Sequence, residues 1–550
     1  MVERKRETMQ ENSKLSVLVI DPNPGMRGNL QNMLNLAGIS KIEYAVNSGT
    51  AVRQLTRRAY DIILCEYDLG SGSGDGQDGQ QLLEDLRHHR LISPWAIFIM
   101  LTSEAVYGKV VSAAELAPTD YVLKPFTAEI LGARIARALE RRAVFLPTWQ
   151  LVAQGNMREA IRSAAASELA HARYALDFAR LRAELHAQLK EHGEAEQIYR
   201  KVLGYKQLGW AGLGLARALF SQDRVDEARD TLQMLVSANP RLMAAYDLLA
   251  RCHESVGAHA QAQKILEEAV AISPHMVRRL RKLGELALEA GDAAAAERSF
   301  KQVVAKARYS EFRDPEDHVK LVKALVKRGD PLAAGGVVRD LERSLRGSPE
   351  VDACVAIANA ALHEATGNRP AALADLQSAA TAVRAGSGLS TGLRVGLVRS
   401  CLAQRLDGPA QEVMMTVVND PDSGMSTADA LRVFADAGRR DLADGMDQQL
   451  KAQAQILLGV ADEKRNMGDV RGAVQTLLEA LHMAPNNLQV TIAAAGGILR
   501  QIAELGWDHP LGELCFEQLE KIRAADPQQP RLGPLTEEYM GLRRKYGIST

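Results

Sequence analysis

Four polar residues stand at or just beyond the carboxyl ends of separate apolar segments in the first quarter of this 550-residue chain: Asp21, Glu66, Thr102 and Lys124. Two carboxylates, a hydroxyl and an ammonium group can together bind a cation or an anionic oxygen group. In parallel sheets, ligands gather at the carboxyl ends of the strands. The spacing therefore predicts one polar site, provided that the apolar segments are strands of a single sheet.

Strand-like and helix-like patterns alternate through this region. Short β-branched runs are typical of buried parallel strands, and amphipathic runs between them predict helices. The expected strands are residues 16–20, 42–46, 61–67, 95–101 and 121–123. The expected helices are residues 26–37, 51–58, 80–88, 106–115 and 127–142. Five β–α units of this size predict a doubly wound parallel sheet.

The same stretches resemble the receiver domain of bacterial two-component response regulators. The matching segments are VLVIDPNPGMR, YDIILCEYDL, IFIMLTSEA and DYVLKPF. In that family an acidic pair after the first strand binds Mg²⁺, and an aspartate after the third strand accepts phosphate from a histidine kinase. The resemblance implies that Thr102 and Lys124 contact the phosphoryl oxygens, and that Tyr121 is the aromatic residue that swings inward on activation.

Two positions depart from the receiver pattern. Pro22 stands where the second acidic residue is expected, and Glu66 stands where the phosphate-accepting aspartate is expected. A Mg²⁺ ion would have only Asp21, Glu66 and a backbone carbonyl, that of Asp68, so we expect weak occupancy and no other cofactor. Phosphoryl transfer depends on positioning, so we predict that the longer Glu66 side chain has lost it.

Three interpretations of this altered site stay open. A permanent Glu66–Lys124 pair would hold a pseudo-receiver near the activated conformation. Alternatively, the domain is an inert docking module. The alternative function is a phosphorylation-switched response regulator that still accepts phosphate at Glu66 or Asp68.

A 34-residue repeat follows the first domain. Pro240 and Pro274 are 34 residues apart, and small and large apolar residues recur at the same offsets before each proline. The matching sets are Leu215, Ala216, Ala228, Leu232 and Leu235; Leu249, Ala250, Ala262, Leu266 and Ala269; and Leu283, Gly284, Ala296 and Phe300. The pattern resembles the tetratricopeptide repeat, in which helix pairs stack into an α-solenoid.

These patterns divide the chain into four segments. They are a disordered tail at 1–13, a receiver-like (βα)₅ domain at 14–142, a tetratricopeptide solenoid at 143–530, and a capping helix with a C-terminal tail at 531–550. No Gly/Ser linker follows the receiver-like domain. Its last helix is therefore expected to abut the solenoid, with Phe145, Leu146 and Trp149 in the contact.

A cluster of basic residues falls on one predicted first helix of the solenoid, and such helices line the concave face. Arg278, Arg281 and Lys282 could bind an acidic peptide or a carboxylate there by charge-assisted hydrogen bonds. Ordinary surface charge is the alternative explanation.

Composition limits the classes of function. The chain has 67 basic and 68 acidic residues, so its net charge of −1 gives no global field for nucleic acid or an anionic membrane. Five dispersed cysteines are typical of reduced thiols in a cytoplasmic protein. No apolar run is long enough to span a membrane.

No catalytic residue set follows from the sequence. It contains no recognisable catalytic triad, phosphate-binding loop, zinc-ligand spacing or paired catalytic carboxylates. We therefore predict a non-catalytic signalling adaptor of a two-component system. Its partners would be proteins such as a sensor histidine kinase or another response regulator.

Overall fold

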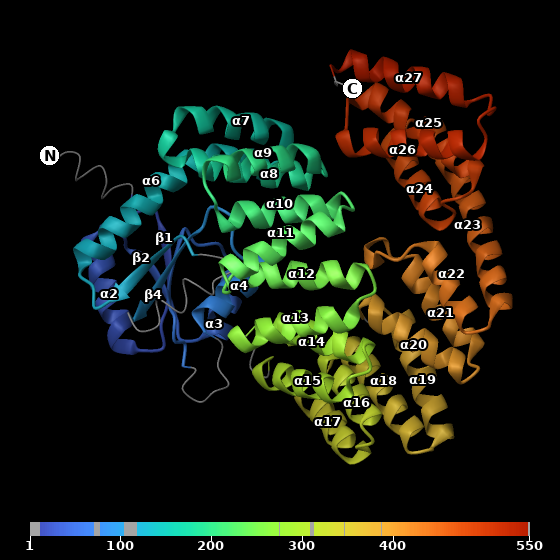
Figure 1. Ribbon diagram of the computed structural model, residues 1–550, viewed down its shortest axis with the longest axis horizontal. Coiled ribbons are helices and arrows are strands. Elements are labelled where there is room, and N and C mark those ends of the chain that lie inside the picture. Colours follow the sequence, from blue (N-terminus) through green and yellow to red (C-terminus); the bar gives the residue numbers. More distant parts are fainter. Residues whose placement is uncertain are drawn as a thin grey trace. The chain divides into compact units, whose positions relative to one another are not determined.

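The structure is a computed structural model that describes residues 12–70, 78–103, 118–273, 276–307, 313–345, 347–386 and 388–547. Contacts divide the chain into two compact units, Met1–Ala324 and Leu325–Thr550. Most of the expected N-terminal tail, most of the glycine-rich segment between Gly70 and Gly79, and the expected helix at 106–115 lie outside the described residues. Figure 1 shows an α/β domain followed by helices.

The N-terminal domain is built on one parallel sheet of order β2-β1-β3-β4-β5. Its strands are β1 (Ser16–Ile20), β2 (Lys41–Ala45), β3 (Ile62–Glu66), β4 (Ile97–Ser103) and β5 (Asp120–Lys124). The predicted doubly wound sheet is therefore confirmed. Strand β4 begins two residues later than expected, because the Ala96 amide donates to the Ser93 carbonyl and closes a turn around Trp95.

Helices cover both faces of this sheet. Helices α2 (Pro24–Leu36) and α6 (Ala128–Ala153) pack on one face, and α3 (Ser48–Arg57) and α4 (Gly79–His88) pack on the other. Strand β3 alternates between the two cores, with Leu64 facing the first and Cys65 the second. Burial on both sides explains the unbroken apolar run IILC.

Helix α6 is shared by the sheet domain and the first helix pair. Leu131 and Ile135 near its start belong to the core of the sheet, whereas Phe145 further along stacks on Phe178 with ring centroids 4.1 Å apart. Trp149 packs against the same aromatic cluster. The helix therefore carries the chain from one domain to the other without a linker, as the sequence predicted (Figure 1).

Helices packed in antiparallel pairs make up the rest of the first unit, whose boundary at Ala324 falls within the last of them, α16. The helices are α7 (Met157–Ala170), α8 (Ala175–Gln188), α9 (His192–Tyr205), α10 (Gly209–Ser221), α11 (Val225–Ala238), α12 (Met243–Ser255), α13 (His259–Ile272), α14 (Val277–Glu289), α15 (Ala293–Ala307) and α16 (Glu316–Lys327). The small residues of the repeat lie at close crossings: a Cβ on Gly284 would approach the Phe300 ring to 2.8 Å. The predicted α-solenoid is confirmed, although Pro274 lies outside the described residues.

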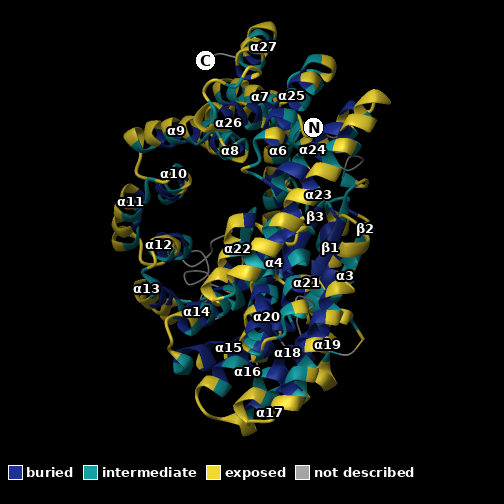
Figure 2. Cartoon of the chain, turned by 90° about the vertical axis from the view of Figure 1, so that its right-hand side faces the viewer, coloured by how far each residue is buried: buried dark blue, intermediate teal, exposed yellow. Residues whose placement is uncertain are grey.

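The second unit is also helical. It contains α17 (Pro331–Ser344), α18 (Pro349–Ala365), α19 (Arg369–Arg384), α20 (Thr391–Ala403), α21 (Asp407–Val418), α22 (Thr427–Asp436), α23 (Arg440–Asn466), α24 (Val470–Met483), α25 (Leu488–Leu505), α26 (His509–Ala525) and α27 (Leu532–Lys545). Buried and exposed residues alternate along these helices, as expected for amphipathic elements that pack on one side (Figure 2). Within the described parts of both units, no helix is long and apolar enough to cross a membrane.

Candidate functional site

The sheet brings the four predicted polar residues to one edge. Asp21 follows β1, and Glu66, Thr102 and Lys124 lie at the carboxyl ends of β3, β4 and β5. The Lys124 ammonium forms an ion pair with Glu66 Oε2 and lies 3.7 Å from Asp21 Oδ2. The Lys124 ammonium is therefore the shared counterion of two carboxylates at the centre of the site.

These charges are largely removed from water. The exposed fraction of the side chain is 2% for Asp21, 12% for Glu66 and 25% for Lys124. The second oxygen of each carboxylate accepts a backbone amide: Asp21 Oδ1 from Asn23 at 2.8 Å, and Glu66 Oε1 from Asp68 at 3.2 Å. In each carboxylate, therefore, one oxygen accepts a hydrogen bond from a backbone amide and the other faces the Lys124 ammonium.

The arrangement is a poor match for Mg²⁺. Pro22 supplies no side-chain oxygen, and the carboxylates of Asp21 and Glu66 both face the Lys124 ammonium. The described residues also hold no group of three or more His, Cys, Asp and Glu side chains placed to bind a metal ion. Weak Mg²⁺ binding through Asp21 and the Asp68 backbone stays a prediction.

The two predicted switch residues flank this site. Thr102 is fully buried, and its hydroxyl donates to the Ser103 carbonyl at 3.4 Å. The Tyr121 ring is partly buried against the core beneath α3 and α4. Tyr121 therefore packs inward on the sheet, on the side that also carries α4.

Comparison with known families fits this geometry. The model of the response regulator receiver domain matches residues 17–136, and tetratricopeptide repeat models match residues 210–241 and 255–313. This chain joins a receiver domain to tetratricopeptide repeats. Such a composition is that of a signalling response regulator with protein-interaction repeats.

Two curated relatives each match about a quarter of this chain. Chemotaxis protein CheY-3 of Vibrio cholerae is 25% identical over 130 residues, which are 24% of this chain and 95% of that protein. Chemotaxis protein CheY of Pseudomonas aeruginosa is 27% identical over 127 residues, 23% of this chain and 98% of that protein. A solved tetratricopeptide repeat protein from Parabacteroides merdae is 14% identical, with a TM-score of 0.30, and the match covers 43% of this chain and 91% of that one.

Helix α4 of the receiver packs directly on the main chain of Glu66. The Gly79 amide at the start of α4 donates to the Tyr67 carbonyl at 2.7 Å. A Cβ at Gly79 would stand 2.5 Å from the Glu66 carbonyl oxygen and 2.9 Å from Met100 Sδ. Only glycine permits this approach, so the position of α4 is tied to the end of β3.

Buried acidic charge surrounds the same strand end. Burial raises the pKa of the Cys65 thiol well above its usual value, and the negative charges of Glu66, Asp78 and Asp21 raise it further. Burial and Asp78 likewise raise the pKa of the Tyr67 phenol. Both groups therefore stay protonated and neutral near neutral pH.

The opposite end of α4 contacts the tetratricopeptide repeats. His88 Nδ1 lies 3.3 Å from Arg278 Nη1 on α14. Glu84, one turn earlier, is only 3% exposed, and Gln80 donates to its Oε1 at 3.0 Å. Burial raises the pKa of Glu84 to about 7, although Gln80 and the positive charge of Arg278 oppose the rise. Sequence reasoning missed this contact.

The next residue of α14, Arg279, forms an ion pair of its own. Arg279 follows Arg278 on α14, and its side chain is 1% exposed. Its Nε and Nη2 donate to the two carboxylate oxygens of Asp247 on α12, both at 2.9 Å. This bidentate pair joins α12 and α14, the first helices of two successive repeats, close to Glu84 of α4.

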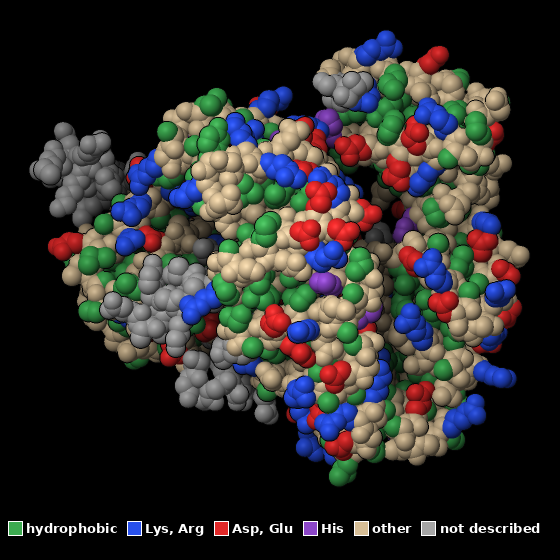
Figure 3. Space-filling model, in the orientation of Figure 1, with side chains coloured by type: hydrophobic (Ala, Val, Ile, Leu, Met, Phe, Trp, Pro, Cys, Tyr) green, Lys and Arg blue, Asp and Glu red, His purple; other side chains and the backbone are tan. Residues whose placement is uncertain are grey.

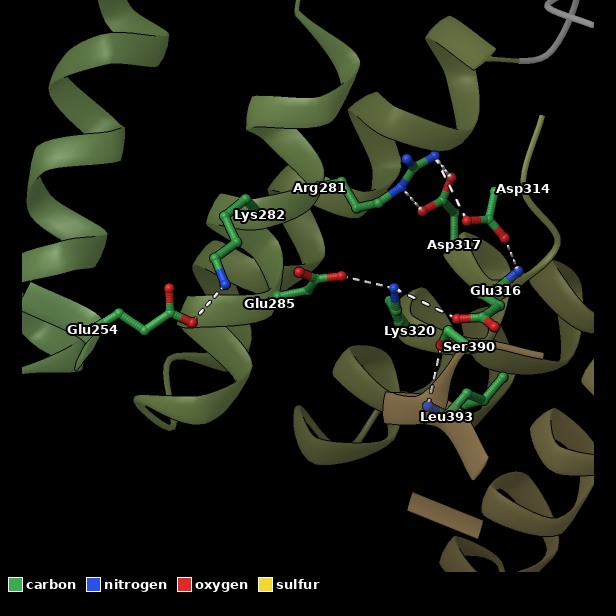
Figure 4. Close-up of polar contacts among 10 residues, drawn as sticks. All are labelled: Glu254, Arg281, Lys282, Glu285, Asp314, Glu316, Asp317, Lys320, Ser390 and Leu393. Atoms are coloured by element: carbon green, nitrogen blue, oxygen red, sulfur yellow. Dashed lines mark hydrogen bonds and ion pairs between the residues drawn. The ribbon is translucent and has the colours of Figure 1, made fainter. Parts of the chain in front are cut away.

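The remaining basic residues predicted to bind a partner are in intramolecular pairs (Figure 4). Arg281 donates to both carboxylate oxygens of Asp317 on α16, at 2.6 and 2.7 Å, and Lys282 pairs with Glu254 on α12 at 2.5 Å. These pairs link neighbouring repeats. Partner binding through Arg278, Arg281 and Lys282 stays a prediction.

Proposed function

We propose that this chain is a non-catalytic signalling adaptor, in which a pseudo-receiver docks on a tetratricopeptide scaffold that binds protein partners. The ion pair between Lys124 and Glu66 is the observation that carries the proposal. The receiver resemblance gives this lysine the task of holding phosphoryl oxygens. Here a carboxylate of the chain itself engages it.

The state of Glu66 argues against phosphoryl transfer. Its Oε2 is paired with Lys124 and its Oε1 accepts the Asp68 amide, so neither oxygen is aimed at an incoming phosphorus. Pro22 removes a carboxylate that would anchor the metal ion. Because in-line transfer rests on positioning and on neutralised charge, both departures lower its rate.

The contacts of α4 support the interpretation that the pseudo-receiver is held in one state. The Glu66 main chain fixes the start of α4 through Gly79, and the end of α4 reaches Arg278. In this proposal the Lys124–Glu66 pair holds the end of β3 in place, and α4, which packs on the main chain of Glu66, is held with it. The inert-module interpretation gives this pair no role in the contact.

The partner of the scaffold would be another protein of a two-component pathway, such as a sensor histidine kinase or another response regulator. Charge favours a protein over a polyanion, because the whole chain has a net charge of −1. Basic and acidic side chains are also interspersed over the face shown in Figure 3.

Intact mass after incubation with acetyl phosphate and Mg²⁺ tests the proposal. We expect the wild-type mass to stay unchanged. A Pro22→Asp/Glu66→Asp variant, which restores the receiver pattern, is the positive control and should gain one phosphoryl group. Stable phosphorylation of the wild type at Glu66 or Asp68 would contradict the adaptor proposal and support the alternative, a phosphorylation-switched response regulator.

A further inference from the structure

Two arginines occupy one repeat position on successive first helices. Arg217 on α10 and Arg251 on α12 are 34 residues apart, which is one repeat. The residue one further repeat along is Glu285 on α14. We call Arg217 and Arg251 the basic strip. It ends after α12, because the equivalent residue on α14 is acidic.

Both arginines line a pocket between α8, α9, α10 and α12. Its volume is about 420 Å³, and its walls include Glu184, Tyr199, Arg217, Phe220, Leu248 and Arg251. Arg251 lies over the Phe220 ring, 5.3 Å from the centroid, so this wall presents an aromatic face beside a cation. The pocket thus combines an apolar wall with two guanidinium groups.

Neither arginine is held in an ion pair by a described acidic side chain. Among the residues that the structure describes, no acidic side chain forms an ion pair with Arg217 or Arg251, whereas Arg279, Arg281 and Lys282 each have one. Desolvation by the pocket walls lowers the pKa of Arg217, and Arg180 and Arg251 lower it further, while Tyr199 and Glu184 act against this. Two guanidinium groups in one pocket, neither of them in an ion pair with a described side chain and with Glu184 as the only acidic residue among the lining residues, favour an anion.

We propose that this pocket binds a short acidic segment of a partner protein that carries an apolar side chain. Carboxylates of the segment would pair with Arg217 and Arg251, and its apolar side chain would pack on Phe220 and Leu248. The inference rests on the proposed adaptor function and names the class of partner. It also assigns partner binding to two arginines that the sequence analysis did not name. Arg278, Arg281 and Lys282, the residues predicted from the sequence, contact other side chains of this chain instead.

The shortness of the basic strip favours a peptide over nucleic acid. Tight binding of a phosphate backbone needs many contacts to Lys and Arg along a groove. Here Glu184 lines the same pocket, and Glu285 occupies the next repeat position. Two cations and an apolar wall suit a motif of a few residues.

Fluorescence anisotropy with the full chain tests the site. The probe is a fluorescein-labelled peptide Glu-Glu-Phe-Glu-Glu, with Gln-Gln-Phe-Gln-Gln as its uncharged counterpart. We expect the acidic peptide to bind more tightly, and Arg217→Gln or Arg251→Gln to weaken it about tenfold, since each removes charge-assisted hydrogen bonds. Arg298→Gln on α15, the second helix of its pair, should leave binding unchanged.

Two results would overturn the inference. One is equal or absent binding of the two peptides, and the other is tighter binding of a decauridylate with the same dependence on Arg217 and Arg251. Far-ultraviolet circular dichroism of each variant shows whether it is folded. Because the acetyl phosphate experiment reads only the receiver, a failed peptide test with an unchanged wild-type mass would reject this pocket and keep the adaptor proposal.

Discussion

Lys124 at the end of β5 forms an ion pair with Glu66 at the end of β3, and its ammonium is also 3.7 Å from Asp21 after β1. Three strands of the receiver sheet are therefore joined by one cation. Burying charged groups costs desolvation energy even when they are paired, but removing one member leaves the others buried without a counterion, which costs more. The folded receiver therefore depends on Lys124 as the counterion of both carboxylates, and the same pair maintains the fixed state that we propose for it.

Lys124→Met should destabilise the receiver by about 2–3 kcal/mol, because two largely buried carboxylates would lose their counterion. Thermal unfolding of the full chain measures the loss. Arg134→Met is the matched control: Arg134 pairs with Asp120 at 3.0 Å, but 41% of its side chain is exposed, so its loss should cost less than about 1 kcal/mol.

A Lys124→Met/Glu66→Gln variant separates charge from packing. Removing one negative charge together with the cation should recover part of the loss seen in Lys124→Met. If the double variant is less stable than the single one, the ion pair does not account for the effect.

Gly79→Ala should shift or unfold the start of α4, because its Cβ would meet the Glu66 carbonyl oxygen at 2.5 Å. The nearest atom belongs to the backbone, and the next two, Met100 Sδ and Cys65 Sγ, belong to fully buried side chains, so there is little room for relief. We expect a loss of about 2 kcal/mol or more. Gly132→Ala in α6 is the control, since its Cβ would have no neighbour within 4 Å. This substitution should stabilise the protein by up to about 1 kcal/mol, because alanine favours the helix over glycine. Equal melting temperatures for the two variants would contradict the close packing.

The receiver site could be predicted because its residues mark the ends of strands. Asp21, Glu66 and Lys124 each terminate an apolar run, and parallel strands bring such ends to one edge whatever the loops between them do. The repeats were predictable for a similar reason. A period of 34 residues recurs locally, so the crossing of Gly284 and Phe300 follows from sequence offsets alone.

The contact between α4 and the repeats could not be predicted, because its partners are far apart in the sequence. His88 meets Arg278 across 190 residues. No clear signal was present in the sequence, because Glu84 lies on the side of α4 opposite Leu82, Leu83 and Leu86, where a carboxylate is expected to face solvent. The pairs of Arg281 and Lys282 were not predicted either, although Asp317 and Glu254 lie only 36 and 28 residues away, about one repeat.

Gly284→Ala tests the small position of the repeat. Its Cβ would stand 2.8 Å from the ring of Phe300, which is fully buried and cannot turn away freely. We expect a loss of about 1–3 kcal/mol in thermal unfolding. Gly204→Ala in α9 should be neutral or stabilising, because nothing lies within 4 Å of its Cβ. Stabilisation by both changes would mean that α14 and α15 cross less closely than described.

Docking of α4 on the repeats should weaken as pH rises from about 4.5 to about 7. The pKa of Glu84 is raised from 4.5 to about 7 in the docked state, so docked α4 binds the Glu84 proton more tightly than undocked α4 does. The stability of docking is therefore full below about pH 4.5 and decreases up to about pH 7, where Glu84 becomes ionised in both states. The limit of the effect is about 3 kcal/mol. Asp78 adds to the rise in pKa, while Gln80, Arg278 and Arg279 oppose it.

Hydrogen exchange of the α4 amides at pH 5, 6, 7 and 8 measures this dependence, after correction for the intrinsic exchange rate. His88 and His89 act in the opposite direction at low pH, because burial and Arg278 lower their pKa values. Comparison with Glu84→Gln at each pH isolates the carboxyl group: the variant should keep α4 protected at pH 7 and 8, where the wild type loses protection. Glu140→Gln, which changes a 61% exposed side chain, should follow the wild type. Identical profiles for the wild type and Glu84→Gln would show that Glu84 is not buried against the repeats.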